Sequence, residues 1–302
     1  MLEYDYRIYG LRVRSQIPFP EAQPDRTGEA EVDIAFGNVP KFLREAGEKG
    51  MGTWTDGFVS AWFRARDGTQ ICVESGKKIT VDLAPEPHMT LVNSLLLSAG
   101  MALICLQRGE LFFHGSVLQR KEQAILLCGE SGAGKSTAAM ELLQRGAGFL
   151  ADDTVRVHPG QREMLAEPSY PQQKLCRDMA RRCGKPLEEL RYIDEDRDKY
   201  AWIRRDCYGK QAVPLKKVFL LRKAQEGENE QVKLRKVIGG EALETMCAQL
   251  YLADTYRHIT GIPYPLMEQL IRVVSRADIY EVTRPATGDT IRDVVEKILQ
   301  FC

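Results

Sequence analysis

Ala124-Ile125-Leu126-Leu127-Cys128-Gly129-Glu130-Ser131-Gly132-Ala133-Gly134-Lys135-Ser136 is the stretch that decides the fold of this 302-residue chain. Its first five residues form an uninterrupted apolar run, which is typical of a buried strand. Its last eight match the pattern G-x-x-x-x-G-K-[ST] in full. The residues from Ser136 to Arg145 then place alanines and leucines at helical spacing, with Gly146 as a C-terminal stop. Strand, glycine-rich loop and helix in this order predict an α/β fold built around a phosphate-binding loop.

The glycine-rich loop predicts a site for the phosphates of a nucleotide. Glycines let the backbone turn so that successive N–H groups point at phosphate oxygens, and the helix that begins near Lys135 adds the positive end of its dipole. We expect Lys135 to act on the β and γ phosphates, as a ligand and a catalytic residue, and Ser136 to ligate Mg²⁺. The residues expected to bind the nucleotide are Gly129, Ser131, Gly132, Ala133, Gly134, Lys135, Ser136 and Thr137.

An acidic pair follows the next predicted strand. Gly148-Phe149-Leu150-Ala151 is apolar, and Asp152 and Asp153 come directly after it. Because the carboxyl ends of strands in such a core meet at one edge, we expect both carboxylates to lie beside the phosphates. One can hold Mg²⁺, directly or through water, while the other accepts the proton of an attacking hydroxyl. The alternative is a polar strand end that caps the following turn.

The sequence divides into two parts, which we predict as a small, mostly β N-terminal domain (1–88) and an α/β catalytic domain (89–302). Short strands are expected at residues 6–13, 30–36, 58–64 and 70–73, separated by Gly, Pro and Asp turns. From Leu91 to Leu106 the chain is apolar nearly all round, which predicts a buried helix that joins the two parts.

Further elements are expected on both sides of the loop. A strand is predicted from Leu111 to His114, continuing through Val117, and others at 218–221 and 279–282. Helices are predicted at 240–257, 265–275 and 289–299. The segment from Gly184 to Lys199 is dense in charge and has little apolar periodicity, so it indicates a solvated stretch or a mobile lid over the phosphate site.

Several polar residues outside the loop are weaker candidates for the site. Lys199, Arg204 and Arg205 could contact a transferred phosphate or an acidic substrate. His114, at the end of its strand, could project into the same crevice, although a lone histidine there is more often structural. His88, His158 and His258 have no companions and are interpreted as structural.

Composition excludes some classes of function. Lysine plus arginine (42) equals aspartate plus glutamate (42), so no global field favours nucleic acid or anionic lipid. No stretch approaches about 18 uninterrupted apolar residues, and the start of the chain lacks the pattern of a secretory signal. The eight cysteines show no C-x-x-C pair or zinc spacing and are interpreted as reduced thiols. We therefore expect a cytoplasmic protein that binds neither nucleic acid nor membrane.

The middle of the chain resembles the catalytic domain of HPr kinase/phosphorylase. The shared elements, in the same order and at similar spacing, are Phe113-His114-Gly115-Ser116-Val117, Gly129 to Ser136, Arg145-Gly146 and Ala151-Asp152-Asp153-Thr154-Val155. Weaker likeness continues through Tyr170-Pro171, Leu175 and the stretch from Pro214 to Leu221. The opening Tyr9-Gly10-Leu11 also looks like the start of HPr-kinase-like proteins, including serine kinases found with lasso-peptide biosynthesis.

This resemblance implies a core like that of phosphoenolpyruvate carboxykinase and the use of ATP with Mg²⁺ to phosphorylate a serine of a protein or peptide. It implies that Asp153 is the base that activates the acceptor hydroxyl, Asp152 its metal-binding or orienting neighbour, and His114 a partner near them. Two departures bear on the substrate: Thr137 stands where the HPr enzymes usually have a glutamate, and their later glycine-rich signature segment is missing. Both argue against HPr as the substrate. The divergent N-terminal region and the missing segment favour the group that modifies a peptide serine, such as the C-terminal serine of a lasso-peptide precursor.

Other functions remain open at this point. A small-molecule kinase would transfer phosphate to a free alcohol, and a nucleotide-binding regulator would bind ATP without phosphorylating an acceptor. Transport ATPases of the ABC type are disfavoured because the chain has no LSGGQ-like signature. The choice between ATP and GTP, the reverse reaction, and the formation of a homo-oligomer are not decided by the sequence.

Overall fold

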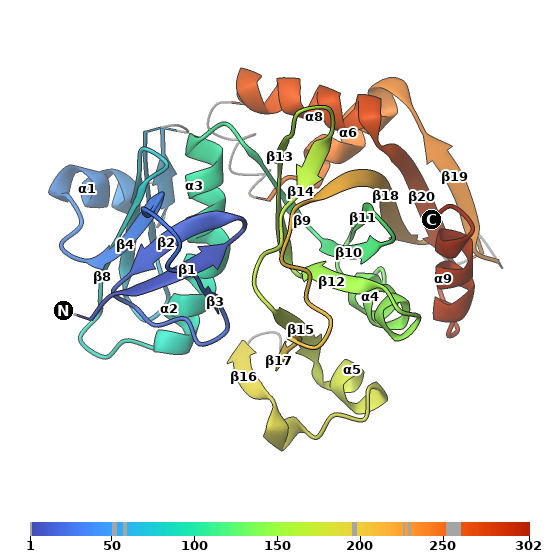
Figure 1. Ribbon diagram of the computed structural model, residues 1–302, viewed down its shortest axis with the longest axis horizontal. Helices are drawn as coiled ribbons and strands as arrows, with labels where there is room; N and C mark the ends of the chain where they lie inside the picture. Colours follow the sequence, from blue (N-terminus) through green and yellow to red (C-terminus); the bar gives the residue numbers. More distant parts are fainter. Residues whose placement is uncertain are drawn as a thin grey trace.

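The computed structural model describes residues 2–49, 53–56, 59–194, 198–225, 227–228, 231–251 and 261–302. It is a mixed α/β structure in which an N-terminal sheet and a second, larger sheet lie side by side, with helices between and around them (Figure 1). The α/β fold class and the mostly β N-terminal region predicted from the sequence are confirmed. The boundary between residues 88 and 89 stays a prediction.

The N-terminal sheet has the strand order β3-β1-β2-β4-β8-β7-β6-β5. Buried and partly exposed residues alternate along β2, as expected for a sheet with one face on the core. The strands predicted over residues 30–36, 58–64 and 70–73 are confirmed as β4, β6 and β7, whereas β3, β5, β8 and helix α1 were missed. The elements are β1 (Tyr4–Ile8), β2 (Leu11–Ser15), β3 (Gln23–Pro24), β4 (Val32–Phe36), α1 (Lys41–Lys49), β5 (Thr53–Thr55), β6 (Ser60–Arg64), β7 (Gln70–Glu74) and β8 (Lys78–Asp82).

The stretch expected as one strand over residues 6–13 is a hairpin. Tyr9 and Gly10 both have positive φ values, 52° and 73°, and β1 pairs with β2 in antiparallel fashion on either side of them. Two consecutive residues of positive φ are typical of the tight turns that match the twist of a hairpin. The turn carries Tyr9 into the interior, where its side chain is fully buried.

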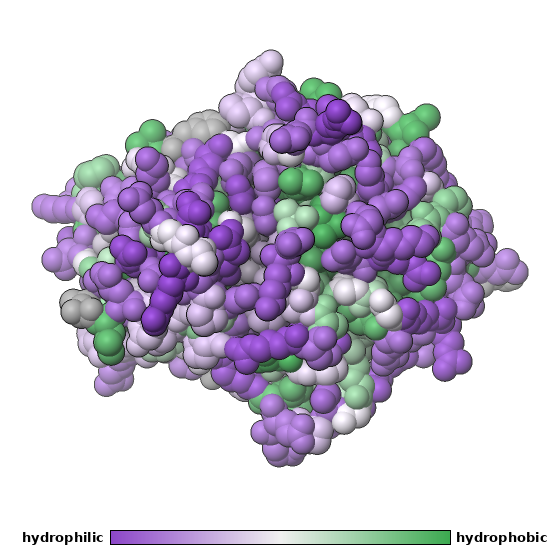
Figure 2. All heavy atoms as spheres, viewed as in Figure 1, coloured by the Kyte–Doolittle hydropathy of each residue, from purple (hydrophilic) through white to green (hydrophobic). Residues whose placement is uncertain are grey.

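The predicted joining helix is confirmed as a continuous helical run over residues 89–107. It consists of α2 (Met89–Leu95), a π-helical turn (Leu96–Gly100) and α3 (Met101–Gln107). In the described part of the chain this is the one helix long and apolar enough to cross a membrane, but 67% of its most apolar window is buried in the fold. It packs beside the N-terminal sheet on the side of the second sheet (Figure 1), and the molecular face in this view is mostly hydrophilic (Figure 2). We interpret it as a core helix.

The second sheet carries the glycine-rich loop. Its strands run in the order β12-β10-β11-β18-β14-β13-β9, and β20 pairs in parallel with β18 and antiparallel with β19. β11 is parallel to β18, so β11, β18 and β20 end at the same edge. The strands are β9 (Leu111–His114), β10 (Ser116–Arg120), β11 (Gln123–Gly129), β12 (Gly148–Ala151), β13 (Thr154–Pro159), β14 (Met164–Ala166), β18 (Val213–Lys223), β19 (Lys233–Val237) and β20 (Asp278–Arg284).

The strand predicted from Leu111 to His114 is confirmed as β9, but its continuation through Val117 is interrupted at Gly115. A Cβ on Gly115 would lie 2.5 Å from the carbonyl oxygen of Leu127, so the backbone approaches β11 too closely for any other residue. The chain then changes partners: β9 pairs with β13, whereas β10 pairs with β11 and β12.

The helices around this sheet agree with the sequence in type and differ in length. The helix predicted over residues 240–257 ends at Ala248, and residues 252–257, like His258, lie outside the described residues. Helix α4 fills the position expected after the loop, and Gly146 follows it at a φ of 86°. The helices are α4 (Lys135–Gln144), α6 (Gly239–Ala248), α8 (Tyr264–Arg276) and α9 (Ile291–Leu299).

The charged segment expected as solvated contains regular structure. It contributes to a small three-stranded sheet with the order β15-β17-β16, to which α5 is attached. We call these elements the side sheet; it lies below β12 and α4 in Figure 1. Its parts are β15 (Gln172–Cys176), α5 (Arg177–Arg182), β16 (Arg191–Asp194) and β17 (Lys199–Ile203). β17 pairs with the distant β15 as well as with its neighbour β16, and local periodicity does not reveal the distant pairing.

One continuous apolar core connects the N-terminal sheet, the helical run and the second sheet. Tyr9 lies in this core, and its hydroxyl donates to the carbonyl oxygen of Leu97 at 3.0 Å and shares a hydrogen bond with Thr154 Oγ1 at 2.6 Å. Thr154 directly follows the acidic pair and begins β13. The N-terminal hairpin is therefore hydrogen-bonded to the strand that comes directly after the pair. The eight cysteines all lie in the described part and none of them forms a disulfide there, as expected.

Tyr9→Phe should lower the free energy of unfolding by roughly 1 to 3 kcal/mol, because it leaves buried hydrogen-bonding groups on Leu97 and Thr154 without their partner. Urea denaturation measures this loss. The control is Tyr264→Phe, since that side chain is 80% exposed and should change stability little. Equal effects of the two substitutions would contradict the structural role given to the Tyr9 hydroxyl.

Candidate active site

The glycine-rich loop leaves β11 at Gly129 and enters α4 at Lys135. Gly129, Gly132 and Gly134 have φ values of 125°, 79° and 103°, a region that other residues adopt only with strain. A Cβ on Gly129 would lie 2.1 Å from the carbonyl oxygen of Leu221, whereas a Cβ on Gly132 would meet nothing within 4 Å. Gly129 is therefore required by packing, while Gly132 faces open space where a ligand can approach the backbone.

Two cations organise the loop. Lys135 turns its Nζ back onto the carbonyl oxygens of Gly129 (2.6 Å) and Glu130 (3.0 Å), and burial lowers the pKa of its ammonium. Arg284, at the end of β20, donates from Nε to the carbonyl oxygen of Ala133 and from Nη2 to that of Gly132, both at 3.0 Å. Because Lys135 and Arg284 bind the carbonyl oxygens of the loop, the N–H groups of the loop are left facing the opposite side.

Arg284 was not predicted, although a signal was present. It stands two positions after the strand expected at residues 279–282. Since parallel strands of such a core end at one edge, an arginine at that strand end is a candidate neighbour of the loop.

The acidic pair lies at the same edge, two strands away from the loop. β10 separates β12 from β11 and is antiparallel to both, so β12 and β11 point the same way. Asp152 is buried; its Oδ1 accepts from Ser116 Oγ at 2.6 Å and its Oδ2 from the backbone N–H of Lys174 at 2.8 Å. Burial raises the pKa of Asp152, and the adjacent Asp153 carboxylate acts in the same direction.

Asp153 forms a buried ion pair with Lys174 of the side sheet. Lys174 Nζ lies 2.7 Å from Asp153 Oδ2, with side-chain exposures of 11% and 15%. Burial alone would raise the pKa of Asp153, but the positive charges of Lys174 and Lys199 and the hydrogen bond from Lys174 hold it well below its usual range. The φ of Asp153 is 70°, a left-handed conformation that aspartate tolerates better than most residues. Asp153 is therefore an ionised carboxylate at neutral pH.

Lys174 is another residue of this site that sequence reasoning missed. Through its backbone N–H it holds Asp152, and through its ammonium it holds Asp153. Its signal was weak, because it stands only one position before Leu175, where the family likeness fades, and a lysine in an alternating strand is usually exposed.

His114 lies beside this pair, as predicted. β9 pairs with β13 so that His114 is opposite Thr154, and the backbone N–H of Gly115 donates to the carbonyl oxygen of Asp153 at 3.1 Å. Burial lowers the pKa of His114, although Asp153 opposes this effect, so the imidazole is neutral at pH 7.

Gln249 connects the end of His114's strand to the glycine-rich loop. Its backbone carbonyl accepts from the N–H of His114 at 2.9 Å, and its side-chain Oε1 accepts from the N–H of Gly129 at 3.0 Å. The histidine and the phosphate loop are thus held at a fixed relative position by one residue.

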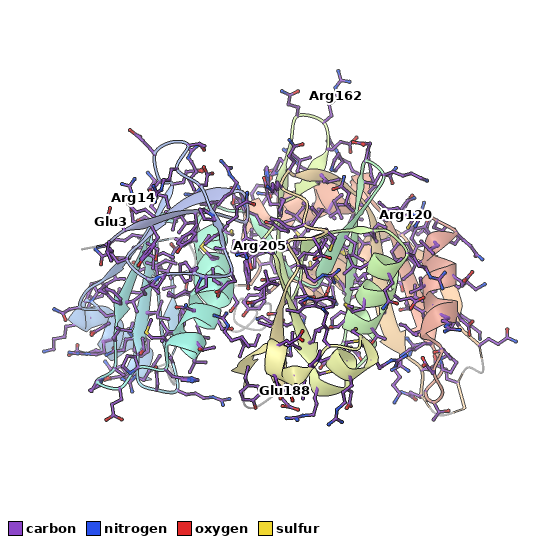
Figure 3. All side chains as sticks on the ribbon, turned by 60° about the horizontal axis from the view of Figure 1, so that its bottom comes forward. Glu3, Arg14, Arg120, Arg162, Glu188 and Arg205 are labelled. Atoms are coloured by element: carbon purple, nitrogen blue, oxygen red, sulfur yellow. The ribbon has the colours of Figure 1, made fainter. Side chains whose placement is uncertain are left out.

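The three basic candidates have different surroundings. The positive charge of Lys199 acts on His114, Lys135 and both aspartates. Arg204 is buried, donates to Gln173 Oε1 at 2.9 Å and stacks over Trp202 at 4.2 Å, so its described contacts are structural. Arg205 donates to the carbonyl oxygen of Pro20 and lies between the two halves of the molecule (Figure 3). Only Lys199 is carried into the proposed site.

The donor set fits a magnesium nucleotide. Among the described residues there is no group of three or more His, Cys, Asp or Glu side chains that could hold a metal by itself. Mg²⁺ is commonly bound by one or two protein oxygens together with substrate phosphates, and Ser136 with Asp152 would supply such a partial set. The open backbone at Gly132, the folded-back Lys135 and the dipole of α4 suit a polyphosphate chain.

The comparisons with known proteins concern this part of the chain. Residues 109–176 match the family model described as HPr Serine kinase C-terminal domain. The "HPr kinase/phosphorylase" of Nitrosomonas europaea is 47% identical over 45 residues, and that of Pelodictyon phaeoclathratiforme 46% identical over 46 residues. Each alignment covers 15% of this chain and 14% of the relative, so the match spans about one seventh of those proteins. The predicted resemblance is confirmed for this segment.

Among solved structures, the HPr(Ser) kinase/phosphatase from Coxiella burnetii is similar with 12% identity and a TM-score of 0.32, over 63% of this chain and 88% of that one. At this level the likeness carries no argument about the site. The site residues rest on the geometry described above, and the link to lasso peptides stays a prediction.

Gly129→Ala should destabilise the protein far more than Gly132→Ala. A methyl group at Gly129 collides with the backbone of Leu221, which cannot move without displacing β18, whereas at Gly132 it costs only the left-handed conformation, about 1 to 2 kcal/mol. Chemical denaturation of both variants provides the comparison. A smaller loss for Gly129→Ala than for Gly132→Ala would contradict the close approach of the two strands.

Lys174→Met should destabilise the fold by roughly 3 kcal/mol, because it leaves the carboxylate of Asp153 buried without its partner. The double variant Lys174→Met/Asp153→Asn should be more stable than Lys174→Met, since the uncompensated charge is gone. Denaturation of the four members of this double-mutant cycle gives the coupling energy, expected at about 1 to 3 kcal/mol. Additive effects would show that the ion pair contributes nothing to stability.

Proposed function

We propose that this protein is an ATP- and Mg²⁺-dependent kinase that transfers the γ-phosphoryl group to the serine hydroxyl of a peptide or small protein. The observation that carries the proposal is the ionised Asp153 carboxylate at the same sheet edge as the phosphate loop, with His114 beside it. A phosphate loop alone serves many nucleotide-binding proteins, but a carboxylate positioned to accept a proton is what transfer to an alcohol requires.

Each residue has a role in this proposal. The N–H groups of residues 129–137 bind the phosphate oxygens, and Lys135 exchanges its contacts with loop carbonyls for contacts with the β and γ phosphates. Ser136 and Asp152 hold Mg²⁺, which when bound neutralises charge on the phosphates. Asp153 accepts the proton of the acceptor hydroxyl, Lys199 supplies positive charge near the transferred group, and neutral His114 orients the acceptor or the carboxylate.

The Lys174–Asp153 ion pair accounts for how the base stays available. A buried carboxylate would otherwise take up a proton and lose its capacity to accept one from an alcohol. With Lys174 and Lys199 beside it, Asp153 is unprotonated at neutral pH although it is buried. The same cations lower its basicity, so the proposed transfer depends on proton acceptance late in the reaction, as loose phosphoryl transfer allows.

The acceptor class rests on the sequence. The match to the HPr Serine kinase C-terminal domain supports a serine hydroxyl. The divergent N-terminal region together with the missing glycine-rich segment favours a peptide, such as the C-terminal serine of a lasso-peptide precursor. We also infer a cytoplasmic protein that binds neither nucleic acid nor membrane, and one capable of forming a homo-oligomer.

Asp153→Asn should lower kcat for transfer of ³²P from γ-labelled ATP to a serine peptide by about 10²- to 10⁴-fold, because proton acceptance is lost while the charge on the loop is unchanged. ATP affinity, measured by calorimetry, should stay within a few-fold. The matched control is Glu188→Gln, an exposed carboxylate at the outer end of the side sheet (Figure 3), which should retain full activity.

Three results would contradict this proposal in different ways. Full transfer by Asp153→Asn would remove its proton-accepting role. Label appearing only on free alcohols in a mass-spectrometric acceptor screen would identify a small-molecule kinase. Binding of ATP without any labelled acceptor would identify a nucleotide-binding regulator.

A further inference from the structure

A pocket of about 360 Å³ opens on the side of the phosphate loop that faces away from the acidic pair. It is lined by Gly134 and Thr137 of the loop and α4, by Arg284, by Arg182 of the side sheet, and by residues 288–291 at the start of α9. Its volume lies at the lower end of the range for small-molecule sites, roughly 300 to 1,000 Å³. We propose that this pocket holds the nucleoside of the bound nucleotide, an inference that rests on the proposed phosphate-binding role.

The order of the strands gives the nucleotide its direction. The acidic pair follows β12, two strands to one side of β11, and Arg284 ends β20, two strands to the other side. With strands about 4.8 Å apart, each lies roughly 10 Å from the loop. A nucleotide whose terminal phosphate faces Asp153 therefore extends its nucleoside toward Arg284 and α9.

The loop itself has the same polarity. Thr137 follows Ser136 in the first turn of α4, and the N–H groups at this end of the motif bind the phosphates nearest the nucleoside. Thr137 lines the pocket, so a chain of phosphates that leaves the loop at this point enters it directly.

The walls of the pocket suit ribose hydroxyls and the edge of a base. Thr290 Oγ1 is buried without a hydrogen-bond partner, although a hydroxyl can both donate and accept. Asp289 Oδ2 lies 2.9 Å from Arg182 Nη2, with both side chains more than half exposed at the mouth. A carboxylate beside a phosphate loop is a typical acceptor for ribose hydroxyls. The pocket thus offers two groups that can bind a nucleoside: the hydroxyl of Thr290, which has no hydrogen-bond partner, and the carboxylate of Asp289, which accepts hydrogen bonds.

Arg284 serves the loop and the pocket at once. Its guanidinium braces the carbonyls of Gly132 and Ala133 and also lines the pocket, and its Nε would lie 3.7 Å from a Cβ on Gly134. In this proposal the guanidinium of Arg284 lies between the phosphate loop and the nucleoside, near the negative charge of the phosphate that is attached to the nucleoside.

The experiment compares two ligands, MgATP and magnesium tripolyphosphate, which share the phosphate chain and differ in the nucleoside. Calorimetry on the full chain should show that the unmodified protein binds ATP more tightly than tripolyphosphate. Thr290→Trp fills the pocket and should weaken ATP about tenfold or more, while tripolyphosphate changes less than about twofold. Because binding is the readout, the acceptor does not need to be known.

Asp289→Ala is the second variant, since it removes a pocket wall without adding bulk. It should weaken ATP and leave tripolyphosphate unchanged. Ile271→Trp, at an exposed position on α8, controls for the added indole and should change neither ligand. The melting temperature of each variant checks that the fold is intact. Binding of tripolyphosphate checks that the phosphate loop is intact.

The outcomes separate this inference from the function on which it rests. Equal weakening of both ligands by Thr290→Trp and Asp289→Ala, or equal affinities of the unmodified protein for both ligands, would overturn the nucleoside pocket and leave the phosphate cradle standing. Failure of both MgATP and magnesium tripolyphosphate to bind would overturn the cradle and the pocket together. Selective loss of ATP in both variants supports the pocket.

Discussion

Lys174 joins the side sheet to the acidic pair, and the candidate site depends on that connection. Its Nζ lies 2.7 Å from Asp153 Oδ2 and its backbone N–H donates to Asp152 at 2.8 Å. Placing two charges in a largely buried position is costly unless each finds a partner, so neither side chain is stable there alone. The ion pair therefore fixes the charge state of Asp153 and, at the same time, the position of β15 against the end of β12.

The N-terminal region supports the same strands from the other side. Arg156 of β13 donates to the carbonyl oxygen of Tyr9 at 2.9 Å and forms a two-pronged ion pair with Glu110, at 2.6 and 2.8 Å. The Tyr9 hydroxyl reaches Thr154, next to Asp153. Because the hairpin turn holds the first half of β13 at Thr154 and Arg156, the left-handed backbone of Asp153 is determined by its surroundings rather than by its own preference.

The sequence predicts those parts of the site that are encoded locally. The loop, the strand before it and the helix after it follow from glycine spacing and apolar periodicity within residues 124–145, and Asp152 and Asp153 follow from their place after a short apolar strand. Lys174 could not be found this way, since it reaches the site through a sheet whose strand order is not given by any local pattern. Arg284 had a signal in its place after an apolar strand, but its position beside the loop also depends on the strand order. Arg204 illustrates the reverse error: a basic residue at the right distance along the chain is committed to Trp202 and Gln173.

The side sheet contacts both ends of the proposed nucleotide site. Its charged residues therefore have specific partners there, which composition alone did not indicate. At one end β15 supplies Lys174 and β17 supplies Lys199 to the acidic pair; at the other, α5 supplies Arg182 to Asp289 at the mouth of the pocket. The Lys174–Asp153 ion pair is largely buried, whereas the Arg182–Asp289 ion pair is exposed. Because water screens a surface ion pair, the Arg182–Asp289 contact is the easier of the two to break. An element held firmly beside the acceptor site and loosely beside the nucleoside pocket can admit a nucleotide at its loose end without disturbing the carboxylate that would receive the proton.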